Sequence, residues 1–142
     1  MTRLWLDANV VLRFLTGEPV EMAREAKELM ARAERGEVAL VVADLVMAET
    51  VWVLRSFYGH PMDRIRDTLS AFAAAPGIEA ERSKVVREAL DLAADENVDF
   101  VDAYLALRAS RAAERVCTFD STDFKRLSGS WARPGSVGVD EG

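Results

Sequence analysis

The feature that most constrains the fold is a run of five apolar residues, VALVV, at residues 38–42. No polar residue interrupts the run, and three of its five residues are β-branched valines. A strand that is apolar on both sides must be covered on both faces, which is typical of a central strand in a parallel sheet. The preceding segment, residues 18–35, is rich in Ala, Glu, Lys and Met at helical spacing. A buried strand next to an amphipathic helix predicts an α/β fold.

Strands and helices alternate along the rest of the chain. We expect further strands at residues 3–6 (RLWL), 78–81 (IEAE), 114–119 (ERVCTF) and 136–139 (SVGV). We expect helices over residues 10–17, 18–35, 44–59, 62–75, 83–97 and 99–114, and a helical turn from 122 or 123 to 127. This order implies a three-layer α/β/α sandwich with a mainly parallel sheet of four to five strands, in one domain over residues 1–142.

The composition narrows the chemistry that such a fold can carry. A formal net charge of −6 argues against binding nucleic acid through a broad basic surface. It leaves room for a nuclease whose acidic centre is neutralised by a divalent metal. The single histidine, His60, lies in a Gly/Pro-flanked loop, and we expect the single cysteine, Cys117, to pack in the core. The chain therefore has too few histidines and cysteines for a zinc site or for Cys-His or Ser-His catalysis to be expected. Any catalytic chemistry must use carboxylates.

The sequence also indicates a compartment. No apolar run approaches the roughly 20 residues that span a bilayer. The opening segment, MTRLWLDANV, has too short an apolar run for a signal peptide. One cysteine forms no internal disulfide, which agrees with a reducing compartment. We therefore expect a cytoplasmic protein that makes no membrane contact.

Four acids are placed to meet at one edge of the expected sheet. Asp7 follows the first strand and Asp120 follows the fourth, and parallel strands end at the same edge. Asp102 lies in the first turn of the helix that Asp99 opens, and Glu49 lies one to two turns into the helix after the second strand. Carboxylates this close repel one another unless a cation lies between them, and oxygen ligands favour Mg²⁺ or Mn²⁺.

Each aspartate also has a structural explanation, because Asp commonly caps helices and complements the helix dipole. The acids at helix starts or strand ends are Asp7, Asp44, Asp99, Asp102 and Asp120. Glu49 is harder to explain in this way. Its helical neighbours Val46 and Val53 place it on or beside the apolar stripe, where a carboxylate needs a partner. Glu49 therefore favours a site over a set of unrelated caps.

Four segments carry a resemblance to a known family. LDANVVLRFL, VVADLVMAETVWVL, VDFVDAYLALRA and VCTFDSTDFKRL, in this order and at these spacings, resemble the PIN-domain ribonucleases. More closely, they resemble the VapC toxins of toxin–antitoxin pairs. The similarity extends from about Leu4 to Leu127 and implies a single PIN-like domain. It also implies a metal-dependent endoribonuclease that hydrolyses RNA phosphodiester bonds with Mg²⁺ or Mn²⁺.

The resemblance also assigns roles to residues by position. Its catalytic and metal-ligating acids fall on Asp7, Glu49, Asp102 and Asp120. The three aspartates would hold the metal, directly or through water. Glu49 would help to orient or deprotonate the attacking water.

Accessory roles follow with weaker support from the same motifs. Asn9 accompanies the first acid. Asp99 either accompanies the third acid or caps its helix. Thr118 and Ser121 offer hydroxyl contacts to a metal-bound water or a phosphate. The sequence departs from many relatives by placing S-T before its next acid, Asp123, which we expect to cap the following turn in preference to reaching a second metal.

The resemblance implies partners as well. The RNA substrate would be held by basic residues near the acidic edge, for which Arg13, Lys125 and Arg126 are candidates. A small antitoxin would cover the site with its C-terminal segment and pair an Arg or Lys with the carboxylates. The apolar faces of helices 18–35 and 44–59 are candidate antitoxin grooves. The family also tends to form homodimers.

Two other functions compete with this interpretation. The first is a PIN-like interaction protein whose acids are only structural. The second is a phosphatase of the haloacid dehalogenase type, which also begins with an aspartate after a strand. That chemistry needs a second aspartate two residues after the nucleophile and a lysine. Here Asn9 stands two residues after Asp7, and no lysine matches cleanly.

Overall fold

The computed structural model describes residues 1–127 and 129–138, and these residues form seven α-helices, a 3₁₀ helix and five short strands. The first elements are β1 (Thr2–Trp5), α1 (Ala8–Thr16), α2 (Val20–Glu34), β2 (Val38–Val42), α3 (Asp44–Ser56) and α4 (Met62–Ala73). The later elements are β3 (Ile78–Ala80), α5 (Ser83–Glu96), α6 (Phe100–Arg111), β4 (Val116–Cys117), α7 (Ser121–Arg126), β5 (Trp131–Ala132) and the 3₁₀ helix η1 (Pro134–Ser136).

The central sheet contains β1, β2 and β3 in that order, and both strand pairs are parallel. Leu40 of β2 lies opposite Leu4 of β1 and Ile78 of β3. All five residues of β2 are buried, as expected for a strand with a neighbour on each side. The predicted α/β class with a parallel sheet is therefore confirmed.

The structure divides the strands between two sheets, whereas the sequence predicts one. β4 and β5 form a separate parallel pair, with Val116 opposite Trp131 and Cys117 opposite Ala132. The expected fifth strand at residues 136–139 is wrong. Ser136 belongs to η1, residues 137–138 are not in a strand, and residue 139 lies outside the described part of the chain. Trp131 and Ala132 form the fifth strand because β4 gives them a pairing partner.

A continuous apolar core joins the central sheet to the helices. Its largest fully buried side chains include Leu40, Met47, Leu54, Ile65, Leu69, Leu90 and Phe100. The cluster continues to Phe124 of α7 and to Leu127. Gly77 precedes β3 with a φ of +81°, and a Cβ there would collide with the backbone carbonyl of Ala33 in α2. Only glycine therefore allows α2 and the start of β3 to approach this closely.

Two local expectations need correction. Asp44 does not cap α3: Ala43 occupies the N-cap position, and the Asp44 side chain instead accepts hydrogen bonds from Tyr104 and Arg82. Cys117 is exposed and does not pack in the core, because β4 is covered by too few neighbouring elements.

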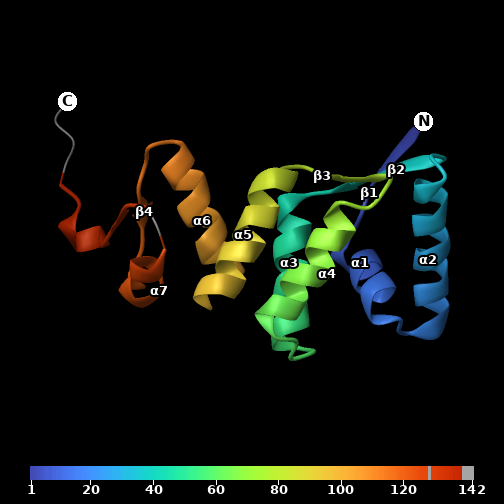
Figure 1. The fold of residues 1–142 in the computed structure, drawn as a ribbon, viewed down its shortest axis with the longest axis horizontal. Coiled ribbons are helices and arrows are strands. Elements are labelled where there is room, and N and C mark those ends of the chain that lie inside the picture. Colours follow the sequence, from blue (N-terminus) through green and yellow to red (C-terminus); the bar gives the residue numbers. More distant parts are fainter. Residues whose placement is uncertain (128, 139–142) are drawn as a thin grey trace.

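The molecule is elongated, with its two sheets at opposite ends (Figure 1). β4, α6 and α7 lie at one end, whereas β1, α1 and α2 lie at the other. Helices α3, α4 and α5 lie between them, and α5 packs against both α4 and α6. In the described residues, no helix has the length and apolar character needed to cross a membrane.

Candidate metal centre

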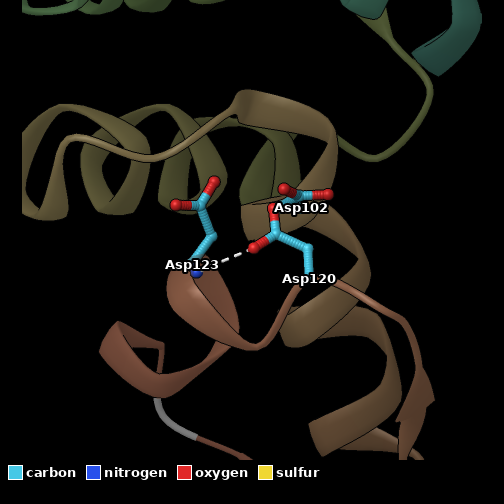
Figure 2. Close-up of side chains that lie close together, drawn as sticks. All are labelled: Asp102, Asp120 and Asp123. Atoms are coloured by element: carbon cyan, nitrogen blue, oxygen red, sulfur yellow. Dashed lines mark hydrogen bonds between the residues drawn. The ribbon is translucent and has the colours of Figure 1, made fainter. Parts of the chain in front are cut away.

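Three aspartates from neighbouring elements bring their carboxylates together at one end of the molecule. Asp102 lies in the first turn of α6, Asp120 lies between β4 and α7, and Asp123 lies in the first turn of α7. One carboxylate oxygen from each lies within 4.8 Å of the other two. Figure 2 shows Asp120 directed toward Asp102, with Asp123 beside them. We call these three residues the acidic triad.

The loop between β4 and α7 fixes the position of Asp120. Its Oδ1 accepts a hydrogen bond of 3.2 Å from the backbone N–H of Asp123 (Figure 2). The backbone N–H of Asp120 donates to Thr118 Oγ1 at 2.9 Å. Asp120 is therefore the N-cap of α7. The sequence predicts Asp123 as the cap of this turn, and that prediction is wrong. The Asp120 side chain is the cap, and the backbone N–H of Asp123 is the group that it caps. The Asp123 carboxylate belongs to the triad.

The electrostatics of the triad centre on Asp102, which is half-buried. Its pKa is raised to about 6, chiefly by burial, which penalises the charged form. The negative charges of Asp99, Asp123 and Asp120 raise it further. A cation between these carboxylates would reverse the repulsion, and a set of oxygen donors suits Mg²⁺ or Mn²⁺. The residues present therefore fit a divalent metal.

A surface pocket of about 370 Å³ adjoins the triad and shares Asp123 with it. Helix α3 contributes Trp52 and Arg55 to its lining, and the start of α6 contributes Asp99. Asp99 occupies the N-cap position of α6, but its side chain makes no cap hydrogen bond. Its carboxylate acts on Asp102 of the triad through its charge, and Arg55 provides a cation in the lining of the same pocket.

The other two predicted acids lie outside the triad. Asp7 comes two residues after β1, a strand at the other end of the molecule from α6 and α7 (Figure 1). Its side chain is exposed and makes no cap hydrogen bond to α1. Glu49 is also exposed, because the buried face of α3 is formed by Met47, Thr50, Val51 and Leu54. Of the two predicted positions, on or beside the apolar stripe, Glu49 occupies the second, and its carboxylate is in solvent and does not require a buried partner. The expected group of four acids is divided between separate parts of the structure.

The predicted accessory residues divide in the same way. Asn9 and Arg13 line a pocket of about 400 Å³ between α1 and α2, close to Asp7 in the chain. Lys125 and Arg126 are exposed in the last turn of α7, near the triad. Ser121 is half-buried at the start of the same helix. Thr118 holds the loop through its hydrogen bond to Asp120.

A polar network that the sequence did not predict fastens α6 to α3. The Tyr104 hydroxyl donates to Asp44 Oδ2, and Arg108 Nη1 donates to the Tyr104 hydroxyl at 2.6 Å. Arg82 Nη1 donates to the same Asp44 oxygen at 3.3 Å. Burial and the hydrogen bond to Asp44 raise the pKa of Tyr104. Tyr104 lies two residues after Asp102 on α6. A tyrosine on the helix of a predicted site acid is the sequence signal that could have pointed to this network.

Comparison with known proteins adds one finding. The model of the PIN domain family matches residues 4–130. No curated protein sequence matches the chain.

Proposed function

The chain belongs to the PIN domain family, and from this premise we propose that it is a metal-dependent endoribonuclease that hydrolyses RNA phosphodiester bonds. PIN domains are generally metal-dependent nucleases. The observation that carries the proposal is the acidic triad, in which Asp102, Asp120 and Asp123 place oxygens within 4.8 Å of one another. The metal would be Mg²⁺ or Mn²⁺.

The chain's own residues have separate tasks in this proposal. Asp102 and Asp120 bind the metal, with Asp123 as a third ligand, and the cap hydrogen bond of Asp120 keeps its second oxygen directed into the triad. A bound Mg²⁺ or Mn²⁺ stabilises charge on the attacked phosphate and lowers the pKa of water. Arg55, which lines the neighbouring pocket, would bind a phosphate of the RNA backbone.

Lys125 and Arg126 extend the same surface for RNA binding, since both are exposed on α7 beside the triad. The net charge of −6 means that acidic residues outnumber basic ones, which disfavours general electrostatic attraction to nucleic acid. Recognition of RNA therefore depends on these few local cations and on the metal.

Asp7 and Glu49 remain part of the proposed catalytic machinery on the strength of the family motifs. Asp7 would complete the metal site, and Glu49 would orient or deprotonate the attacking water. Both are exposed and require another element to approach them.

The finer proposal is that the enzyme is the VapC-type toxin of a toxin–antitoxin pair. Two apolar pockets support a protein partner: one between α1 and α2, and one of about 450 Å³ between α3 and α6. Leu45 in the second pocket is 83% exposed. A small antitoxin that suppresses RNA cleavage when mixed with this chain would support the assignment, and the absence of any such protein encoded beside it would contradict it.

The test of the central proposal compares Asp120→Asn with Asp91→Asn. Asp91 is an exposed acid of α5 outside the triad, so its variant makes the same charge change at a distant site. We expect Asp120→Asn to lower Mg²⁺-dependent cleavage of RNA by roughly 10²-fold or more, and Asp91→Asn to leave it unchanged. Titration calorimetry with Mn²⁺ should show weakened binding for Asp120→Asn alone.

Three outcomes separate the candidate functions. Equal cleavage by wild type and Asp120→Asn would contradict the site. A wild type that neither binds Mn²⁺ at millimolar concentration nor cleaves RNA would favour the interaction protein. A covalent phosphate trapped on Asp7 would favour the haloacid dehalogenase-type phosphatase.

A further inference from the structure

Each of the two sheets has two edge strands, β1 and β3 in the central sheet and β4 and β5 in the smaller one. Among residues 1–127 and 129–138, β1 pairs only with β2, and β4 pairs only with β5. All four residues of β1 are exposed, including Leu4 at 41% and Trp5 at 63%. Parallel strands are normally buried, and an open apolar edge is a template for pairing with another strand. The outer edge of β1 is therefore incomplete.

The division of the acids follows the division of the sheets. Asp7 follows β1 and Asp120 follows β4, with Leu4 and Cys117 each three residues before its acid. If β4 lay parallel to β1 with Leu4 opposite Cys117, the two acids would lie at the same edge of one sheet. The strand order would then be β5-β4-β1-β2-β3, with every neighbouring pair parallel.

The chain's own β4 is held away from β1. Helix α6 is fastened to α5 by the Arg111–Glu88 ion pair and to α3 by the Tyr104–Asp44 hydrogen bond. Only residues 112–115 separate α6 from β4, and four residues extend at most about 14 Å. Helices α3, α4 and α5 lie between α6 and β1 (Figure 1), and one helix is about 10 Å across. While α6 keeps its contacts, β4 does not reach β1 of the same chain.

We infer that a second copy of this chain supplies the missing strand: β4 of each copy pairs with β1 of the other. The exchange is reciprocal, so it closes a twofold dimer and leaves neither edge open. It places Asp7 of one copy beside the acidic triad of the other, which completes each metal centre from two chains. The strand pairing stands independently, whereas its catalytic consequence rests on the proposed ribonuclease function.

The first experiment tests the pairing without using activity. Leu4→Cys places a thiol opposite the native Cys117 in the proposed register. Under mild oxidation we expect most of this variant to run as a covalent dimer, at twice the 15.7 kDa of one chain, on a non-reducing gel. The control is Glu28→Cys, which places the thiol on the exposed surface of α2 and should run at the mass of one chain on the same non-reducing gel.

Three results would overturn the inference. An intrachain disulfide, which migrates as a compact monomer, would show that β4 closes onto β1 of its own chain. Equal dimer yields from Leu4→Cys and Glu28→Cys would show random collision between exposed thiols. Light scattering of the wild type at one chain mass would also contradict the exchange.

The second experiment tests whether the two chains share one centre. Asp7→Ala and Asp120→Ala, each inactive alone, are co-expressed with different tags. Random pairing restores about one quarter of the wild-type cleavage activity, because half of the dimers are mixed and each mixed dimer holds one intact centre. The matched control co-expresses Asp7→Ala with Glu49→Gln and should restore no cleavage activity. In the proposed dimer both residues come from the chain that supplies β1, so every centre of a mixed dimer lacks one of them.

Failure of the two proposals is distinguishable. If the wild type cleaves no RNA, the ribonuclease function fails, but the Leu4–Cys117 disulfide still decides the exchange. If the wild type cleaves RNA and the mixed dimer does not, the shared centre is wrong.

Discussion

The body of the molecule, from β1 to α5, and the terminal unit, from α6 to β5, differ in how their strands are buried. All five residues of β2 in the body are buried, whereas β4 in the terminal unit has two residues, one of them exposed. The terminal unit nevertheless holds the whole acidic triad. The most tightly packed residues and the proposed metal ligands therefore lie in different regions. Substitutions in the body should lower the free energy of unfolding, whereas substitutions in the triad should lower metal affinity.

The largest effect on stability is expected from Leu40→Ala in the centre of β2. Leu40 is fully buried between two neighbouring strands, so its truncation leaves a cavity and costs about 2–5 kcal/mol. Urea unfolding measures the loss. Mn²⁺ affinity at a temperature where the variant is folded should stay unchanged.

The matched variant in the terminal unit is Val116→Ala in β4. Val116 is half-buried in a strand with one partner, so we expect a cost of about 1 kcal/mol or less. Equal losses for Leu40→Ala and Val116→Ala would show that the two regions are packed alike.

Gly77→Ala tests how tightly the body is packed around its sheet. Gly77 has a φ of +81°, and a methyl group there would meet the backbone of Ala33. We expect a cost of about 2–4 kcal/mol from backbone strain and overpacking. Gly59 has a φ of +70° with open space around it, so Gly59→Ala should cost only about 1 kcal/mol. Thermal unfolding of both variants separates strain from crowding.

The helices and the central strand were predictable because their signals are local. The run of apolar residues places β2 at Val38–Val42, as predicted, and α3 begins at Asp44 as the sequence indicates. The N-cap assignment of Asp44 failed because a residue sixty positions away, Tyr104, captures its carboxylate. The fifth strand failed for the same reason, since Trp131 and Ala132 become a strand only by pairing with β4.

Part of the candidate centre was also predictable. The juxtaposition of Asp102 and Asp120 follows from a helix start and a strand end. That Asp120 caps α7 while it also belongs to the triad, and that Asp123 joins the triad, was not predictable, because it depends on which carboxylate turns back to the helix N-terminus. The expected position of Asp7 beside them assumed one continuous sheet, and the structure has two. The catalytic roles of all these acids remain predictions.

The stability of the terminal unit should depend on pH through Asp102 of the triad. Asp102 keeps its proton to about pH 6 in the folded protein, whereas the ordinary pKa of an aspartate is 3.8. Between these values the folded state binds more protons than the unfolded state, so the stability of the metal-free protein falls as the pH rises. Urea unfolding in EDTA should show this fall, and Asp102→Asn should remove it.

Metal binding should show the opposite dependence on pH. The proton on Asp102 competes with the metal, so Mn²⁺ affinity should fall by about tenfold for each pH unit below about 6. Calorimetric titration across this range measures the slope. An affinity independent of pH down to about pH 5 would place the metal away from Asp102.

A further small effect is expected at the joint between the two regions. Tyr104→Phe removes the hydroxyl that donates to Asp44 and accepts from Arg108. Because Arg82 still pairs with Asp44 at 3.3 Å, the loss should be about 1 kcal/mol. If the hydroxyl positions α6, Mn²⁺ affinity should also weaken, since Asp102 lies on the same helix. Thr50→Val is the control: its hydroxyl bonds only within α3, to Val46. If Thr50→Val loses similar stability but keeps its Mn²⁺ affinity, the weaker Mn²⁺ binding of Tyr104→Phe is due to the joint. If the two variants bind Mn²⁺ equally well, Tyr104 is only a structural residue.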